Sequence, residues 1–159
     1  ALMERDPDVL AYAIEISCRT KAAIVAEDER ESGRRALLNL GHTFAHAIET
    51  GTGYGHWLHG EAVGAGMLMA ADLSRRLGQL DDDQYERVEH LLRRAHLPRR
   101  APASLDADRF RELMAGDKKV QGGRLRLVLL RRIGEAEVRA DFDPDRLDAA
   151  LREFPRTNA

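Results

Sequence analysis

The first thirty residues place apolar and polar side chains with the period of an α-helix. Apolar residues recur at three- and four-residue steps from Val9 to Ile24. Asp6 offers a capping side chain immediately before Pro7, and proline is favoured in the first turn of a helix. The pattern therefore predicts an amphipathic helix from Pro7 to about Asp28.

The same kinds of signal predict five further helices. Capping side chains, glycines and prolines bound them at 35–50, at 59–78, at 81–98, in a short segment ended by Gly116, and from Asp143 onward. Between the last two, residues 124–130 begin with strand-like alternation, Gly134 marks a turn, and residues 136–140 return as a partner strand. The expected fold is mostly α, a multi-helix domain with one small β-hairpin.

Composition limits the classes of function. The 159 residues fit one domain, and 43% hydrophobic residues can build a core, which excludes a disordered chain. The 25 Lys and Arg residues nearly cancel the 27 Asp and Glu residues, so no basic excess points to a nucleic acid or to an anionic membrane. The expected partner is a small molecule or another protein.

The single cysteine, Cys18, cannot form an internal disulfide, which favours a reducing compartment, and it is expected to be a core residue. No apolar run approaches the roughly 18 residues of a membrane span, and the first residues do not resemble a signal peptide. We therefore expect a cytoplasmic protein.

The segment 36–48 (ALLNLGHTFAHAI) contains no charged residue, although one third of the chain is charged. A helix there should be buried on most sides. Advancing about 100° per residue places four polar side chains on one face: Arg35, Asn39, His42 and His46. A face turned to water would normally carry Glu and Lys, so this face is expected to line a cavity.

A second histidine cluster, 56–61 (HWLHGE), precedes the small-residue run 62–66 (AVGAG). Glycine costs roughly 1 kcal/mol inside a helix, so this run indicates close approach to the preceding helix, which would bring His59 to His42. Converging imidazoles suit zinc, which takes three protein ligands and an open position in catalytic sites. Two histidines do not complete such a site, HExxH is absent, and a hydrogen-bonding role for His42 is the alternative.

Basic side chains are expected to frame this pocket and to favour an anionic substrate. They are Lys21, Arg35, Lys118 and Lys119. Taken singly, each is an ordinary surface charge.

The segments 34–49 (RRALLNLGHTFAHAIE) and 54–63 (YGHWLHGEAV) closely resemble the 3-dehydroquinate synthase family of the shikimate pathway, and so do 28–35 and 117–119. The resemblance covers the C-terminal helical domain alone, so residues 1–159 are expected to be that domain. The N-terminal NAD-binding domain has no counterpart in these residues.

The resemblance implies a metal- and NAD-dependent lyase of aromatic amino acid biosynthesis, a homodimer when complete. It would convert 3-deoxy-D-arabino-heptulosonate 7-phosphate to 3-dehydroquinate and phosphate, with Zn²⁺ or Co²⁺ bound and with NAD held mainly by the missing domain. The 159 residues alone are expected to be inactive and to bind zinc weakly.

The resemblance also implies a role for each matching residue. His42 and His59 would be zinc ligands, with a glutamate upstream of Ala1 as the third. Lys21 and Arg35 would bind the substrate carboxylate, Asn39 and His46 would line the pocket, and Lys118 or Lys119 would bind the phosphate. Apart from the resemblance, His46 lies one turn from His42 and could relay protons. Glu61, two residues after His59, is placed to support that ligand, with an ordinary surface or ion-pair role as the alternative.

Three alternatives remain at this point. The chain could belong to another sugar-phosphate cyclase or to a metal-dependent polyol dehydrogenase of the same superfamily. It could also be a helical interaction module without catalytic activity. The pair Lys21 and Arg35 favours the synthase, because a substrate without a carboxylate has no use for both.

Overall fold

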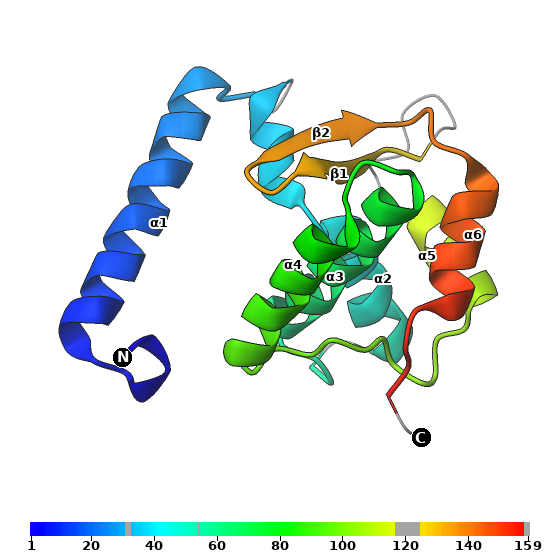
Figure 1. Ribbon diagram of the computed structural model, residues 1–159, viewed down its shortest axis with the longest axis horizontal. Coiled ribbons are helices and arrows are strands. Elements are labelled where there is room, and N and C mark those ends of the chain that lie inside the picture. The colour runs from blue at the N-terminus through cyan, green and yellow to red at the C-terminus, as the bar shows by residue number, and fades with distance from the viewer. Residues whose placement is uncertain (31–32, 54, 117–124, 158–159) are drawn as a thin grey trace. The chain divides into compact units, whose positions relative to one another are not determined.

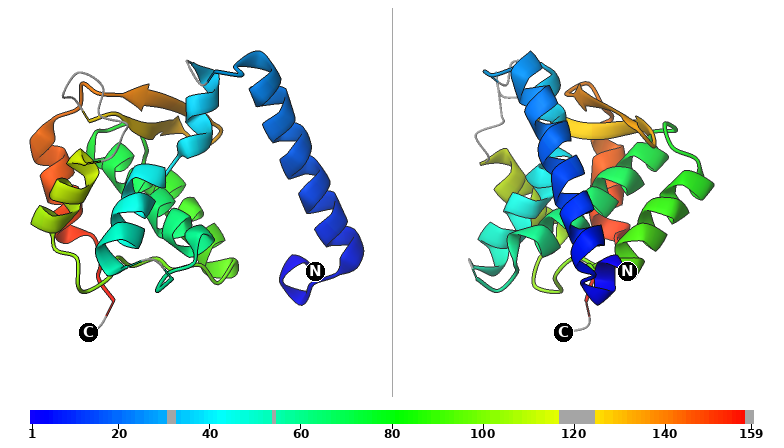
Figure 2. Two further views of the ribbon diagram at one scale, coloured as in Figure 1. Left: turned by 180° about the vertical axis from the view of Figure 1, so that it is seen from behind. Right: turned by 90° about the vertical axis from the view of Figure 1, so that its left-hand side faces the viewer.

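The computed structural model describes residues 1–30, 33–53, 55–116 and 125–157. Its contacts divide the chain into two compact units, Ala1–Leu38 and Asn39–Ala159. Figure 1 labels the elements, and Figure 2 shows them from two further sides. Within the described residues, none of the helices has the length and apolar character needed to cross a membrane.

The first unit contains the 3-10 helix η1 (Leu2–Glu4), the helix α1 (Pro7–Glu27) and most of the 3-10 helix η2 (Arg34–Asn39). The Asp6 carboxylate accepts hydrogen bonds from the backbone N–H groups of Asp8 and Val9 at 3.1 Å, so α1 begins where the sequence predicts. None of its side chains is buried. The expectation that Cys18 is a core residue is therefore wrong, because this residue of α1 is exposed.

The predicted helix over 35–50 is also wrong in its first half. Residues Arg34–Asn39 form η2, the chain turns at Gly41 with a φ of 81°, and only then does α2 (His42–Thr52) begin. A Cβ atom at Gly41 would lie 2.5 Å from the amide nitrogen of Met67, so a side chain there would be excluded by the neighbouring backbone.

The break at Gly41 also changes the polar face predicted by advancing about 100° per residue along one helix. A rotation of about 100° per residue does not carry through a 3-10 segment and a left-handed glycine. The grouping of Arg35 and Asn39 with the histidines on one helix face is therefore wrong. His42 and His46, both within α2, do lie one turn apart.

The second unit is arranged around α3 (His59–Arg76), which contacts α2, α4, α6 and the first strand of the hairpin (Figure 1). The remaining elements are α4 (Asp82–Arg94), α5 (Ala107–Ala115), β1 (Leu127–Arg132), β2 (Glu135–Arg139) and α6 (Pro144–Glu153). The two strands pair antiparallel, with Val128 opposite Val138. The predicted fold, mostly helical with one small hairpin, is confirmed.

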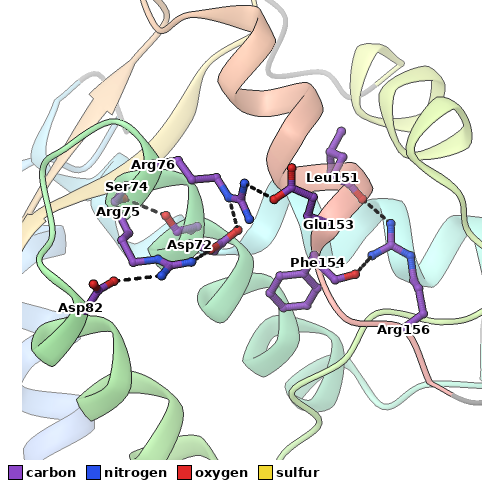
Figure 3. Close-up of polar contacts among 10 residues, drawn as sticks. Asp72, Ser74, Arg75, Arg76, Asp82, Leu151, Glu153, Phe154 and Arg156 are labelled. Atoms are coloured by element: carbon purple, nitrogen blue, oxygen red, sulfur yellow. Dashed lines mark hydrogen bonds and ion pairs between the residues drawn. The ribbon is translucent and has the colours of Figure 1, made fainter.

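Polar contacts anchor the C-terminal half of α3 (Figure 3). Asp72, 3% exposed, accepts hydrogen bonds from Arg75 at 2.8 Å and from Arg76 at 2.7 Å. The buried Ser74 hydroxyl donates to the Ala70 carbonyl at 2.7 Å and accepts from the N–H of Leu130 in β1 at 2.9 Å. These contacts fix the helix whose first residue is His59.

Candidate functional site

The first turns of α2 carry two histidines on one side of the helix. The other residues of this segment, Thr43, Phe44 and Ala45, are buried, while His42 and His46 are half-buried. The ring centroids of the two histidines lie 6.0 Å apart, with the rings perpendicular. The buried face of α2 thus fixes the helix and leaves both imidazoles at the edge of the core.

His59, the first residue of α3, meets His42 as the sequence predicts. Their ring centroids lie 5.5 Å apart at an interplanar angle of 67°. The approach is possible because Gly66 on α3 lies against the backbone of Gly41. The inference that small residues on this helix allow close contact with the preceding one is confirmed.

The donor set fits a divalent metal. The Nδ1 atom of His42 lies 3.3 Å from the carbonyl oxygen of Leu40, so a proton on Nδ1 would be donated there, with the lone pair on Nε2. Two imidazoles bound to one tetrahedral zinc hold their ring centroids roughly 5 Å apart, close to the separation of His42 and His59. Among the residues that the structure describes, no group of three His, Cys, Asp or Glu side chains is assembled for a metal. A third ligand would have to come from elsewhere.

Two carboxylates lie near His59, and the structure gives them different roles. Glu49, near the end of α2, places Oε1 3.1 Å from Nδ1 of His59. Glu61 instead accepts a hydrogen bond from the N–H of Leu58 at 3.0 Å and so caps the start of α3. Sequence reasoning considered Glu61 and missed Glu49, because the contact joins the end of α2 to the start of α3 and leaves no local signal in the sequence.

Of the four basic residues expected at the site, Lys21 and Arg35 lie within the described residues. Lys21 is exposed on α1, and Arg35 is half-buried in η2, where Nη1 donates to the Glu29 carbonyl at 2.5 Å. Both belong to the first unit, so their part in the site stays a prediction. Lys118 and Lys119 lie outside the described residues.

The remaining candidates are a polar residue and three other histidines. Asn39 is half-buried at the end of η2, and its place in the pocket stays a prediction. His56, to which the sequence gives no role, is exposed. His90 and His96 are also exposed.

Comparison with known proteins points to a single family. The family model described as 3-dehydroquinate synthase C-terminal matches residues 1–120. A 3-dehydroquinate synthase of Nitrosococcus oceani is 63% identical over 150 residues, which make up 94% of this chain and 42% of that protein. The chain thus spans about two fifths of the length of this curated relative.

Two solved structures share the fold. A 2-epi-5-epi-valiolone synthase from Streptomyces hygroscopicus subsp. jinggangensis, with NAD⁺ and Zn²⁺ bound, is 26% identical with a TM-score of 0.80, over 92% of this chain and 40% of that one. A 2-deoxy-scyllo-inosose synthase complexed with carbaglucose-6-phosphate, NAD⁺ and Co²⁺ is 24% identical with a TM-score of 0.81, over 94% of this chain and 43% of that one.

Proposed function

This chain belongs to the 3-dehydroquinate synthase family, and from that membership we propose that it is the metal- and substrate-binding part of a 3-dehydroquinate synthase. The complete enzyme would convert 3-deoxy-D-arabino-heptulosonate 7-phosphate to 3-dehydroquinate and phosphate. The observation that carries the proposal is the convergence of His42 and His59, whose ring centroids lie 5.5 Å apart on two different helices.

His42 and His59 would hold the metal, Zn²⁺ or Co²⁺, together with a glutamate of the N-terminal part. When bound, the metal polarises substrate hydroxyl groups and lowers their pKa. The close contact of Gly66 in α3 with Gly41, directly before α2, fixes the two helices side by side and so positions both histidines for this role. The Zn²⁺ in the related 2-epi-5-epi-valiolone synthase supports this choice of metal.

The other residues of the chain would bind and orient the substrate. Lys21 and Arg35 would hold its carboxylate, and Lys118 or Lys119 its phosphate, because Arg and Lys are suited to these anions. Asn39 would line the pocket. His46, one turn from His42, would accept or return a proton of the substrate.

The proposal includes partners that lie beyond these residues. An N-terminal domain would bind NAD, which the reaction uses and regenerates, and the complete enzyme would be a homodimer in the cytoplasm. The NAD⁺ bound in the related synthase supports the cofactor. The 159 residues alone would neither turn over substrate nor bind zinc tightly, because a catalytic zinc site ordinarily has three protein ligands.

Phosphate release from the heptulosonate substrate, with NAD and Zn²⁺ added to the full-length protein, tests the proposal. Full-length H42A and H59A should lose both stoichiometric zinc and turnover. H90A, which removes an exposed histidine on α4, is the matched control and should keep both. Turnover by the full-length H42A/H59A double variant would contradict the proposal.

The substrate class can be tested separately. Full-length R35A and K21A should raise KM for the heptulosonate phosphate by about ten- to a hundredfold, since each removes a charged hydrogen bond of about 1.5–3 kcal/mol. In a cyclase that acts on sugar phosphates without a carboxylate, neither substitution would change the KM for the substrate. A helical interaction module would hold no zinc in the metal analysis of the wild-type protein.

A further inference from the structure

We propose that Glu49 is the residue that positions His59 for metal binding, an inference that rests on the function proposed above. The Oε1 atom of Glu49 lies 3.1 Å from Nδ1 of His59, and the two residues come from different helices. The Glu49 side chain is only 14% exposed, whereas that of His59 is 59% exposed. A largely exposed imidazole has little packing to fix its ring, so the carboxylate is what orients it.

The contact also selects the nitrogen that faces the metal. A carboxylate is an acceptor, so it favours a proton on Nδ1 and places the lone pair of the neutral ring on Nε2. At His42 the Leu40 carbonyl faces the same ring atom, Nδ1, at 3.3 Å. The carbonyl at His42 and the carboxylate at His59 thus favour the same tautomer, with the proton on Nδ1.

Glu61 is the obvious rival, because it lies two residues after His59 in the sequence. Its Oε2 atom accepts the N–H of Leu58 at 3.0 Å, which is the capping contact at the start of α3. Glu49 reaches His59 from α2, the neighbouring helix. The two carboxylates therefore have different roles: Glu61 caps the start of α3, and Glu49 orients the imidazole ring of His59.

The tautomer of His59 is the first test, and it needs no metal. Long-range ¹H–¹⁵N NMR spectra of the 159-residue chain, recorded at alkaline pH where imidazole is neutral, should show the proton of His59 on Nδ1. E49A should move that proton toward Nε2, and E49Q, which keeps an acceptor oxygen and the side-chain volume, should restore the wild-type tautomer. E61A is the matched control and should leave the tautomer of His59 unchanged. An unchanged tautomer in E49A would overturn the inference.

Zinc titration by calorimetry is the second test. In the full-length protein, E49A should weaken zinc binding by about 10- to 100-fold, as loss of a carboxylate behind a ligating histidine typically does, while E49Q should lie between E49A and the wild type. Wild-type zinc affinity in E49A and E49Q would overturn the inference and leave the proposed function intact. If the tautomer responds to E49A but the full-length protein has no synthase activity, the proposed function fails while the pairing of Glu49 with His59 stands.

Discussion

Gly66 in the middle of α3 lies directly against the carbonyl oxygen of Gly41, the residue that precedes α2. A Cβ atom at position 66 would overlap that oxygen and lie 3.1 Å from the amide nitrogen of Ala45. The same carbonyl accepts the first hydrogen bond of α2, from the N–H of Ala45 at 2.9 Å. The helices that carry His42 and His59 therefore meet backbone to backbone.

G66A is expected to separate the two helices. The added methyl group meets backbone atoms that cannot rotate away, and overpacking of this kind lowers the free energy of unfolding by about 1–3 kcal/mol. Urea denaturation measures the loss. G60A, on the same helix with open space around the added Cβ, is the control and should be neutral or slightly stabilising. Equal stability of G66A and G60A would contradict the close contact.

S74A should destabilise the joint between α3 and the hairpin. The Ser74 hydroxyl accepts a hydrogen bond from the backbone N–H of Leu130, a residue that is largely buried. Removal of the hydroxyl leaves this N–H without its acceptor, which should lower the free energy of unfolding by about 1–3 kcal/mol. The matched control is S17A: Ser17 also donates to the carbonyl four residues earlier, at 2.7 Å, but it is exposed on α1. S17A should change the free energy of unfolding by less than about 0.5 kcal/mol. A similar loss in both variants would mean that the contact with Leu130 contributes nothing.

The elements that could be predicted from the sequence are those whose signals are local. Asp6, Asp81 and Asp143 each accept backbone N–H groups in the first turn of the helix that follows, and a side chain with that role can be recognised from its neighbours alone. The hairpin followed from alternation and from Gly134, whose φ is 90°. The break at Gly41 could not be found this way, because Met67 and Gly66, far along the chain, exclude a side chain there.

The candidate site shows the same difference between local signals and contacts that depend on how the elements pack. The meeting of His42 and His59 could be predicted, because glycines on α3 indicated close packing of two consecutive helices. The pairing of Glu49 with His59 could not, because it depends on how the end of α2 faces the start of α3. The prediction that Cys18 is buried was wrong for a related reason. Burial depends on what covers α1, and the pattern of residues along α1 does not contain that information.

D72N should be among the most destabilising single substitutions of a polar residue in the second unit. The Asp72 side chain is 4% exposed, and its carboxylate accepts hydrogen bonds from both Arg75 and Arg76. Its neutralisation leaves two guanidinium groups without their buried counter-charge, at a cost of about 3 kcal/mol. The control is D82N, which removes the exposed partner of Arg75 and should cost at most about 1 kcal/mol. Thermal unfolding at low and high salt separates them, because only the exposed pair is screened. Equal losses for D72N and D82N would contradict a special role for the buried carboxylate.

Stability at alkaline pH should depend on Tyr85, whose ring lies 4.6 Å from the guanidinium carbon of Arg75. Burial, reinforced by the negative charge of Asp72, raises the pKa of Tyr85 from 10.0 to about 12. The unfolded chain therefore loses this proton at a lower pH than the folded chain does, so the contribution to stability is complete below about pH 10 and is lost as the pH rises toward 12. Y85F keeps the ring over Arg75 and removes the ionisable group, so its unfolding temperature should fall less steeply between these two pH values than that of the wild type. Y12F, which removes an exposed phenol, is the matched control, and an alkaline decline in Y85F as steep as in Y12F would show that Tyr85 is not the group responsible.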